Sequence, residues 1–112
     1  MLYILEDNTI RLTRGDTAAI TVTILDDISG KEYELKFTDT LKLSVKKTVK
    51  DEEYCFQKEV TGSNNIVIEP DDTSALAFGK YKYDVELKLD TGAVSTIIEP
   101  STFEILPEVT CK

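Results

Sequence analysis

Along most of the chain, hydrophobic and polar residues alternate with a period of two, which is typical of β-strands with one face against a core. The clearest alternation covers residues 80–89, where Tyr81, Tyr83, Val85, Leu87 and Leu89 alternate with charged residues. The same pattern predicts further strands at residues 9–13, 18–24, 33–37, 41–45, 56–60, 66–68, 94–98 and 103–105. Because helical periodicity is nearly absent, we expect an all-β fold of about 7–9 strands.

Turn residues between these segments indicate how the strands are connected. Asp90-Thr91-Gly92 has the composition of a hairpin turn, so residues 94–98 are expected to pair with the strand before it. Val94, Thr96 and Ile98 would then face the core and Ile97 the opposite side, and Pro100 would break the pairing. Short strands with frequent turn signals favour an antiparallel sandwich over a barrel.

One helical signal interrupts the strands, near residues 71–77. The acidic pair there resembles a helix cap, and Gly79 ends the segment. Leu76, Gly79 and Tyr81 have the spacing of a tyrosine corner, in which the tyrosine hydroxyl bonds to the backbone of an immunoglobulin-like or fibronectin-like sandwich. Tyr81 is equally compatible with a plain core residue, and both interpretations give the same fold.

The length of 112 residues leaves room for a single β-sandwich domain spanning residues 1–112. Within it, residues 1–8 and 107–112 are expected to be flexible ends. Twenty-one acidic and thirteen basic residues give a net charge of −8, which argues against nucleic acid or an anionic membrane as partner. The apolar start is too short for a signal peptide and no hydrophobic run could span a membrane, so we expect synthesis in the cytoplasm.

The residue types argue against an enzyme and against a resident cofactor. The sequence has no histidine, which removes the commonest general base and the commonest zinc ligand. Cys55 and Cys111 do not form a CxxC motif, and two free thiols are the plainer interpretation, with a Cys55–Cys111 disulfide as the alternative. Acidic clusters at residues 26–27, 51–53 and 71–72 lack the spaced pattern of a calcium loop, so no metal site is predicted.

Three further features bear on binding. Arg14-Gly15-Asp16 spells an integrin-recognition tripeptide, but Gly-Asp between two strands is also what a tight turn requires. An antiparallel sandwich leaves strand edges that another chain can extend, and we expect the threonine-rich face of Thr17, Thr21 and Thr23, or Ile97, to border such a contact. Ile97 is alternatively a lone exposed apolar residue, and we name no interface residues from the sequence.

Several segments together resemble a known family. They are Thr9–Ala18, the Leu41-x-Leu43-x-Val45-Lys46-Lys47 strand, the run from Ile66 through Pro70, Asp72, Leu76, Gly79 and Tyr81 to Leu87, and the closing Gly92–Pro100 and Phe103-x-Ile105 segments. Over residues 9–110 the chain resembles small prophage structural proteins of low-GC Gram-positive bacteria, in particular the N-terminal domain of phage baseplate upper proteins.

The resemblance implies an immunoglobulin-like antiparallel β-sandwich that docks proteins in a phage tail or baseplate and catalyses nothing. The implied partners are other tail or baseplate proteins, with a homo-oligomer compatible with the symmetry of tails. The chain would be made in the bacterial cytoplasm and become a virion component. Larger baseplate upper proteins continue beyond this domain, whereas this sequence ends at Lys112. The alternative is a stand-alone sandwich module that binds carbohydrate or a host protein.

Overall fold

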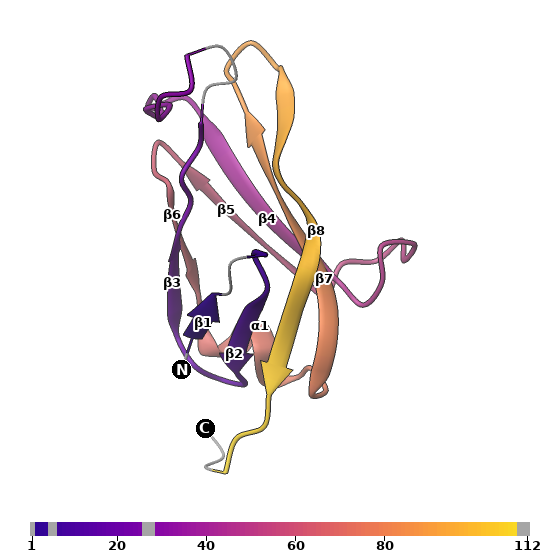
Figure 1. Cartoon of the computed structure of the whole chain (residues 1–112). Coiled ribbons are helices and arrows are strands. Elements are labelled where there is room, and N and C mark those ends of the chain that lie inside the picture. Colours follow the sequence, from indigo (N-terminus) through magenta and orange to yellow (C-terminus); the bar gives the residue numbers. More distant parts are fainter. Residues whose placement is uncertain (1, 5–6, 26–28, 110–112) are drawn as a thin grey trace.

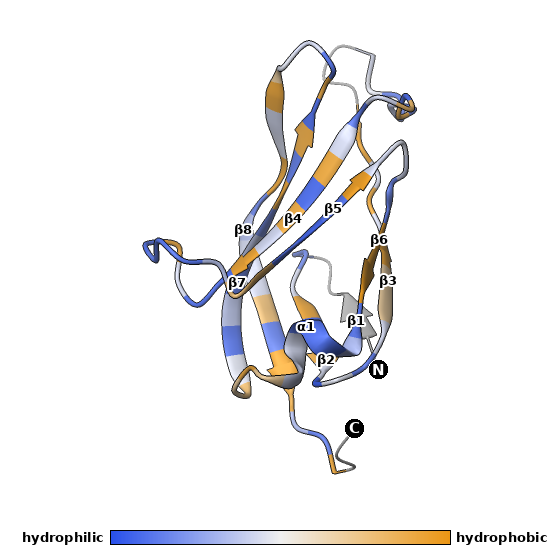
Figure 2. Ribbon diagram, turned by 180° about the vertical axis from the view of Figure 1, so that it is seen from behind, coloured by the Kyte–Doolittle hydropathy of each residue, from blue (hydrophilic) through white to orange (hydrophobic). Residues whose placement is uncertain are grey.

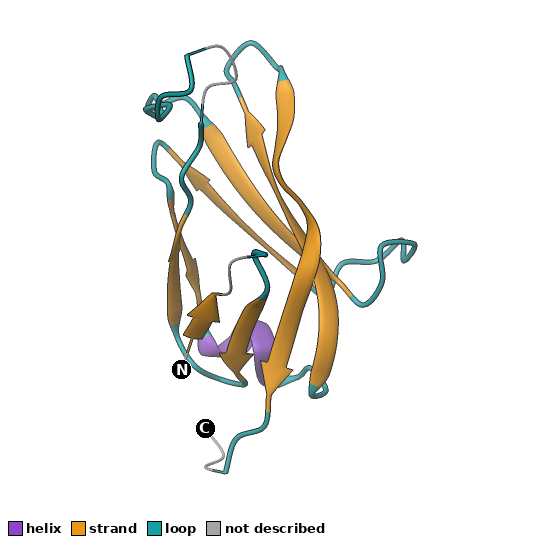
Figure 3. Ribbon diagram, viewed as in Figure 1, coloured by secondary structure: helices purple, strands orange, loops and turns teal. Residues whose placement is uncertain are grey.

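The chain folds into β-strands with one short helix (Figures 1 and 3). The structure, a computed structural model, describes residues 2–4, 7–25 and 29–109. The elements in these residues are β1 (Leu2–Ile4), β2 (Ile10–Thr13), β3 (Ala18–Thr21), β4 (Thr40–Lys46), β5 (Phe56–Thr61), β6 (Asn65–Ile68), α1 (Pro70–Ser74), β7 (Gly79–Lys88) and β8 (Val94–Leu106). The prediction that the chain is mostly β is therefore confirmed.

The strands form one large sheet and one small sheet. The large sheet has the order β1-β2-β8-β7-β4-β5, and the small sheet pairs β3 with β6. Figure 1 shows the large sheet curling around the interior, with the small sheet on its open side. All pairings are antiparallel except that of β2 with β8, which is parallel. The expectation of a wholly antiparallel arrangement is thus wrong at one pair. These strands come from opposite ends of the chain, so no hairpin fixes their relative direction.

The core forms from the strand faces that the alternation predicted. Figure 2 shows hydrophobic and polar residues alternating along β4 and β7. Tyr81, Tyr83, Val85 and Leu87 are all buried, and Leu89 packs partly buried against them. The centre of the core consists of residues with 1% exposure or less, namely Ile10, Leu12, Leu41, Leu43, Val45, Ile66, Ile68, Val85, Phe103 and Ile105. These side chains come from both sheets, and their removal from water stabilises the packing of one sheet on the other.

The strand predicted at residues 33–37 is wrong. That segment has no strand, only an isolated bridge between Leu25 and Glu32 just before it, and the Phe37 side chain is 86% exposed. The reason lies in Asp39, whose buried carboxylate accepts hydrogen bonds from the Tyr33 hydroxyl (2.7 Å) and from the backbone N–H of Lys36 (3.0 Å). These bonds lower the pKa of Asp39, the Lys36 bond most, and bend the segment into a turn.

The faces predicted for residues 94–98 are also wrong, and Pro100 interrupts the pairing with β7 without ending the strand. β8 runs unbroken from Val94 to Leu106, but its register with β7 shifts on both sides of Val85. Each shift acts as a β-bulge, and a bulge changes which side of the sheet the following residues face. Ile97 and Ile98 therefore both pack against the core, whereas Val94 is 55% exposed. Pro100 lies within the irregular stretch, where its missing N–H costs no ladder bond.

The chain ends differ partly from expectation. Within residues 1–8, predicted to be a flexible end, Leu2–Ile4 forms β1 and pairs with β2. At the other end, residues 110–112 lie outside the described residues, and Glu108 contacts Arg14. The helical corner expected near residues 71–77 is α1 followed by a turn, and it begins at Pro70.

Candidate functional site

The corner residues Leu76, Gly79 and Tyr81 lie between α1 and β7. The Tyr81 hydroxyl donates a hydrogen bond to the carbonyl of Ala77 at 2.8 Å, and its ring is buried in the core. Burial raises the pKa of Tyr81. Gly79 has a φ of 134°, which side-chain-bearing residues rarely adopt, and Leu76 packs partly buried against the core. Tyr81 thus acts as a core residue and as a link to the corner backbone, and all three residues hold the fold together.

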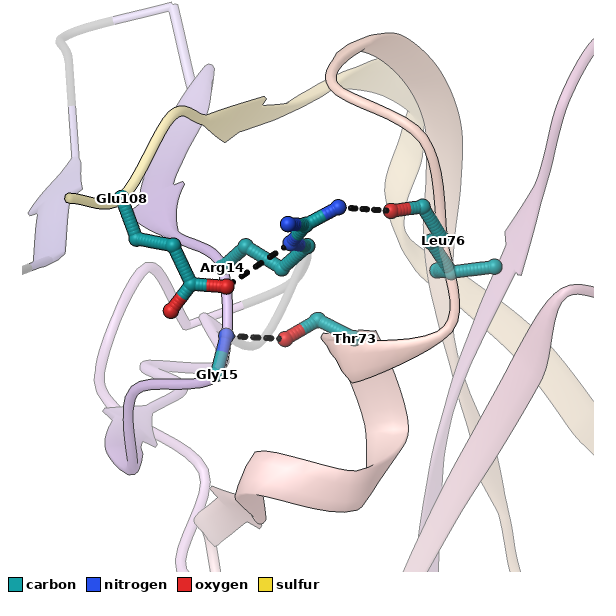
Figure 4. Close-up of polar contacts among 5 residues, drawn as sticks. All are labelled: Arg14, Gly15, Thr73, Leu76 and Glu108. Atoms are coloured by element: carbon teal, nitrogen blue, oxygen red, sulfur yellow. Dashed lines mark hydrogen bonds and ion pairs between the residues drawn. The ribbon is translucent and has the colours of Figure 1, made fainter. Parts of the chain in front are cut away.

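The Arg14-Gly15-Asp16 tripeptide is fixed by its surroundings (Figure 4). The Arg14 guanidinium donates to the Glu108 carboxylate at 2.9 Å and to the Leu76 carbonyl at 3.3 Å. It also lies 4.2 Å from the centroid of the Phe78 ring. The buried N–H of Gly15 donates to the Thr73 hydroxyl at 2.9 Å. Because Arg14 is committed to these contacts, the tripeptide serves as the turn between β2 and β3, held against α1 by the Gly15–Thr73 bond, and we assign it no adhesion role.

The two acidic clusters that the structure describes, at residues 51–53 and 71–72, do not gather into a metal site. Asp51 accepts the backbone N–H of Thr48, and Asp72 accepts that of Glu69 and pairs with Lys58 at 3.1 Å. Residues 26–27 fall outside the described residues. Throughout residues 2–4, 7–25 and 29–109, no three side chains of His, Cys, Asp or Glu gather closely enough to hold a metal ion.

The described cysteine is not arranged as a nucleophile. Cys55 is partly buried against the core, and its backbone N–H donates to the carbonyl of Val45 at 2.7 Å. Burial raises the pKa of the Cys55 thiol, and the negative charge of Asp51 acts in the same direction. A raised thiol pKa lowers the fraction of thiolate at neutral pH. Cys111 lies outside the described residues, so the alternative of a Cys55–Cys111 disulfide stays untested.

The outer face of the large sheet is slightly hollowed where β4 and β7 lie side by side. Lys42, Lys46, Asp84 and Glu86 line this hollow of about 140 Å³ together with Tyr54. Burial raises the pKa of Asp84, and the charge of Glu86 adds to the shift. The Lys46 ammonium lies 4.7 Å from the centroid of the Tyr54 ring and so occupies one face of it. The mixed charges suit a solvated sheet face, and we assign no chemistry to the hollow.

The first half of β8 has a free strand edge. β7 lies on one side of this half, whereas β2 pairs with β8 only at Phe103–Leu106 (Figure 1). No described strand therefore pairs with the outer edge of residues 94–101. Unpaired N–H and C=O groups along such an edge form a template for a strand from another chain. Residues 91–98 are also uncharged, in a chain of which 30% is charged.

The register of β8 shows which backbone groups are free at this edge. The N–H of Leu89 donates to the carbonyl of Ala93 at 2.9 Å, and Ser95 lies opposite Leu87 two residues further on. Hydrogen-bonded pairs alternate along an antiparallel ladder, so Ser95 bonds to β7. Val94 and Thr96 consequently direct their N–H and C=O groups away from β7, toward the open edge.

A cleft of mixed polar and apolar lining adjoins the inner side of the same edge. It has a volume of about 460 Å³, and its lining includes Ile24, Leu25, Tyr33, Ser95 and Ile97. Leu25, in the cleft lining, is 64% exposed, and Val94, on the outer face of β8, is 55% exposed. Hydrophobic surface is therefore exposed on both sides of the edge. Strand addition commonly combines main-chain bonds with pockets for alternate side chains, and the edge and cleft provide both.

Sequence reasoning located part of this site. It named Ile97 as a residue that could border a contact, and Ile97 does line the cleft. The sequence also predicted an exposed threonine-rich face of Thr17, Thr21 and Thr23. All three are exposed, but they lie in or next to β3, in the other sheet. Val94, Ser95 and Thr96 were missed, although the uncharged run at residues 91–98 is a usable signal.

Comparison of the sequence with protein-family models and with curated protein sequences finds no match. In the part of the chain that the structure describes, no helix is both long and apolar enough to cross a membrane.

Proposed function

We propose that this chain is a non-catalytic protein–protein docking domain of a phage or prophage tail or baseplate, built as an immunoglobulin-like β-sandwich. The observation that carries the docking role is the unpaired, uncharged edge of β8 at residues 94–98. Proteins usually protect such an edge with charges, proline or a covering loop. On β8 the charge and the proline, Glu99 and Pro100, come only after Ile98. A protein that assembles through strand addition needs the edge open.

The setting in a phage particle is supported by the sequence resemblance to baseplate upper proteins. The residues that carry this resemblance include the turn after β2, the corner between α1 and β7, and the strand pattern of β7. The corner and turn are bonded together through Thr73, Leu76 and Arg14, as expected of a rigid docking scaffold. Other tail or baseplate proteins are the proposed partners.

The second candidate is a stand-alone sandwich that binds carbohydrate or a host protein. Tyr54, half exposed beside the hollow on the outer face, is the observation that favours it. Sugar sites usually present open aromatic faces, and the chain has no tryptophan. Because Lys46 already lies over the Tyr54 ring, the docking domain remains the stronger proposal.

The test is to locate the chain in particles. Particles induced from the bacterium that encodes the chain are purified and probed by immunogold electron microscopy and mass spectrometry. We expect label at one end of the tail in wild-type particles, and a loss of label when Ser95→Lys places a charge on the β8 edge. Ser74→Lys, which adds the same charge at the exposed end of α1, should be incorporated normally. Absence of wild-type chain from intact tails contradicts the proposal.

A further inference from the structure

We propose that the free edge of β8 binds the same edge of a second copy of this chain, in an antiparallel register centred on Ser95. This inference rests on the proposed docking function and names one partner for it. Two copies related by a two-fold axis would join their large sheets edge to edge. Such a contact is isologous, so the same residues act on both sides.

The backbone of β8 is self-complementary in this register. Val94 of one copy lies opposite Thr96 of the other, and the reverse pair follows from the two-fold symmetry. These are the residues whose N–H and C=O groups point away from β7. Each of the two pairs exchanges two hydrogen bonds, so every outward group of Val94 and Thr96 is satisfied. A shift by one residue would instead aim these groups at residues that already bond to β7.

The side chains fit the same register. Ser95 lies opposite itself on the axis, in a non-hydrogen-bonded pair, where the two backbones approach most closely and small side chains are favoured. On the inner face, Ala93 of the second copy lies opposite Ile97, next to the cleft that Ile97 lines with Ile24 and Leu25. On the outer face, Val94 and Thr96 form cross-strand pairs of β-branched side chains, which stabilise antiparallel sheets.

Charge favours a second copy at this edge. Each copy has a net charge of −8, so contact between most of their surfaces would be repulsive. Residues 91–98 contain no charged side chain, so two copies can meet there without placing like charges in contact. The edge strand β5, by contrast, has charged residues, and its Lys58 forms an ion pair with Asp72 of α1. β5 is thereby guarded against the addition of another strand.

The edge of β3 is the competing candidate, because residues 17–25 are also uncharged. β3 pairs with β6 and is four residues long, whereas the uncharged open part of β8 runs from Val94 to Ile98. The cleft lies between the two candidates, since Ile24 and Leu25 line it as well as Ser95 and Ile97, but β8 alone has the exposed Val94 at its edge. A strand pair alone is smaller than the roughly 1,200–2,000 Å² of a stable interface, so the dimer should be concentration-dependent.

The test is the mass in solution of the purified chain across a dilution series, by light scattering and sedimentation. The wild-type mass should rise from 12.6 kDa toward twice that value with concentration. Ser95→Lys should keep the chain monomeric throughout, because it places two positive charges face to face on the axis. Ser74→Lys, with the same change in net charge, should dimerise like wild type. Circular dichroism and urea unfolding verify that both variants are folded.

A second variant at the same edge tests the inference even if Ser95→Lys does not fold. Thr96→Pro removes an outward N–H but no bond to β7, and proline is tolerated at such edge positions. It too should abolish the dimer. The inference is overturned if wild type stays monomeric at every concentration, or if Thr21→Lys on β3, rather than the β8 variants, abolishes association. A monomer that still enters phage tails contradicts this inference alone, whereas a β8-dependent dimer absent from tails contradicts only the proposed function.

Discussion

At the scale of single residues, buried tyrosine hydroxyls connect the core to the chain around it. Tyr81 donates to the carbonyl of Ala77 at the corner, and Tyr83 donates to the carbonyl of Asn8, ahead of β2. The rings of Tyr83 and Phe103 pack edge to face, with centroids 6.1 Å apart. Each tyrosine combines a large apolar ring with one satisfied polar atom, as expected of tyrosines inside a small core.

We predict that Tyr81→Phe destabilises the fold by about 1 kcal/mol, the usual net value of one hydrogen bond. The ring stays in the core, and water can bond to the carbonyl of the exposed Ala77, so the loss of unfolding free energy should be modest. Urea unfolding measures this change in free energy. Tyr54→Phe, at a half-exposed tyrosine, is the matched control and should leave the midpoint unchanged. Equal effects of the two substitutions would show that the corner bond contributes nothing.

We also predict a loss of stability at alkaline pH that depends on Tyr83. Burial raises the pKa of Tyr83 to about 12, and the charge of Asp7 acts in the same direction. The unfolded chain releases this proton near pH 10, whereas the folded chain retains it. Stability should therefore be complete below pH 10 and decline from pH 10 to about pH 12. Urea unfolding at several pH values measures the slope, which should be smaller in Tyr83→Phe.

At the scale of elements, the joint between the turn after β2 and α1 depends on one buried hydrogen bond. The N–H of Gly15 donates to the Thr73 hydroxyl, and both residues are buried. Thr73→Val keeps the shape but leaves this N–H without a partner, which should cost about 1–3 kcal/mol of unfolding free energy. Thr73→Ser retains the hydroxyl and should lose less unfolding free energy than Thr73→Val. If the two variants unfold at the same urea concentration, the hydrogen bond is not the stabilising contact.

The elements also show what the sequence could predict. Strict alternation was sufficient for β4 and β7, because both faces of these strands have consistent environments and the period of two is undisturbed. It failed at residues 33–37, where the buried Asp39 bends the backbone, and at β8, where bulges change the faces. The first failure has a local cause, because Asp39 lies three residues after Lys36 and six after Tyr33. The second has a tertiary cause, the register of β8 with β7. Local spacing suggested a corner at Tyr81 as one of two alternatives, and Tyr81 has features of both, a hydroxyl bonded to the Ala77 carbonyl and a buried ring.

At the scale of the whole molecule, the distribution of charge separates protected surfaces from open ones. Ion pairs lie on the solvent side of the fold, as between Arg11 and Glu104 at 3.0 Å and between Lys58 and Asp72. The β8 edge at residues 94–98 has none of these charges, and on its side away from β7 no described strand pairs with it. The sequence contains the uncharged run, but only the strand order shows that the run forms a free edge. The open edge at Val94, Ser95 and Thr96 was therefore beyond sequence reasoning.

The most direct test of the central claim, that this chain assembles through the open edge of β8, is residue-resolved amide hydrogen exchange by NMR. In dilute protein the amides of Val94 and Thr96 should exchange fast, while that of Ser95, bonded to β7, should be protected. At concentrations where the mass doubles, Val94 and Thr96 should become protected as well. The account is contradicted if these two amides are already protected in dilute protein. It is also contradicted if their exchange rates do not change on association.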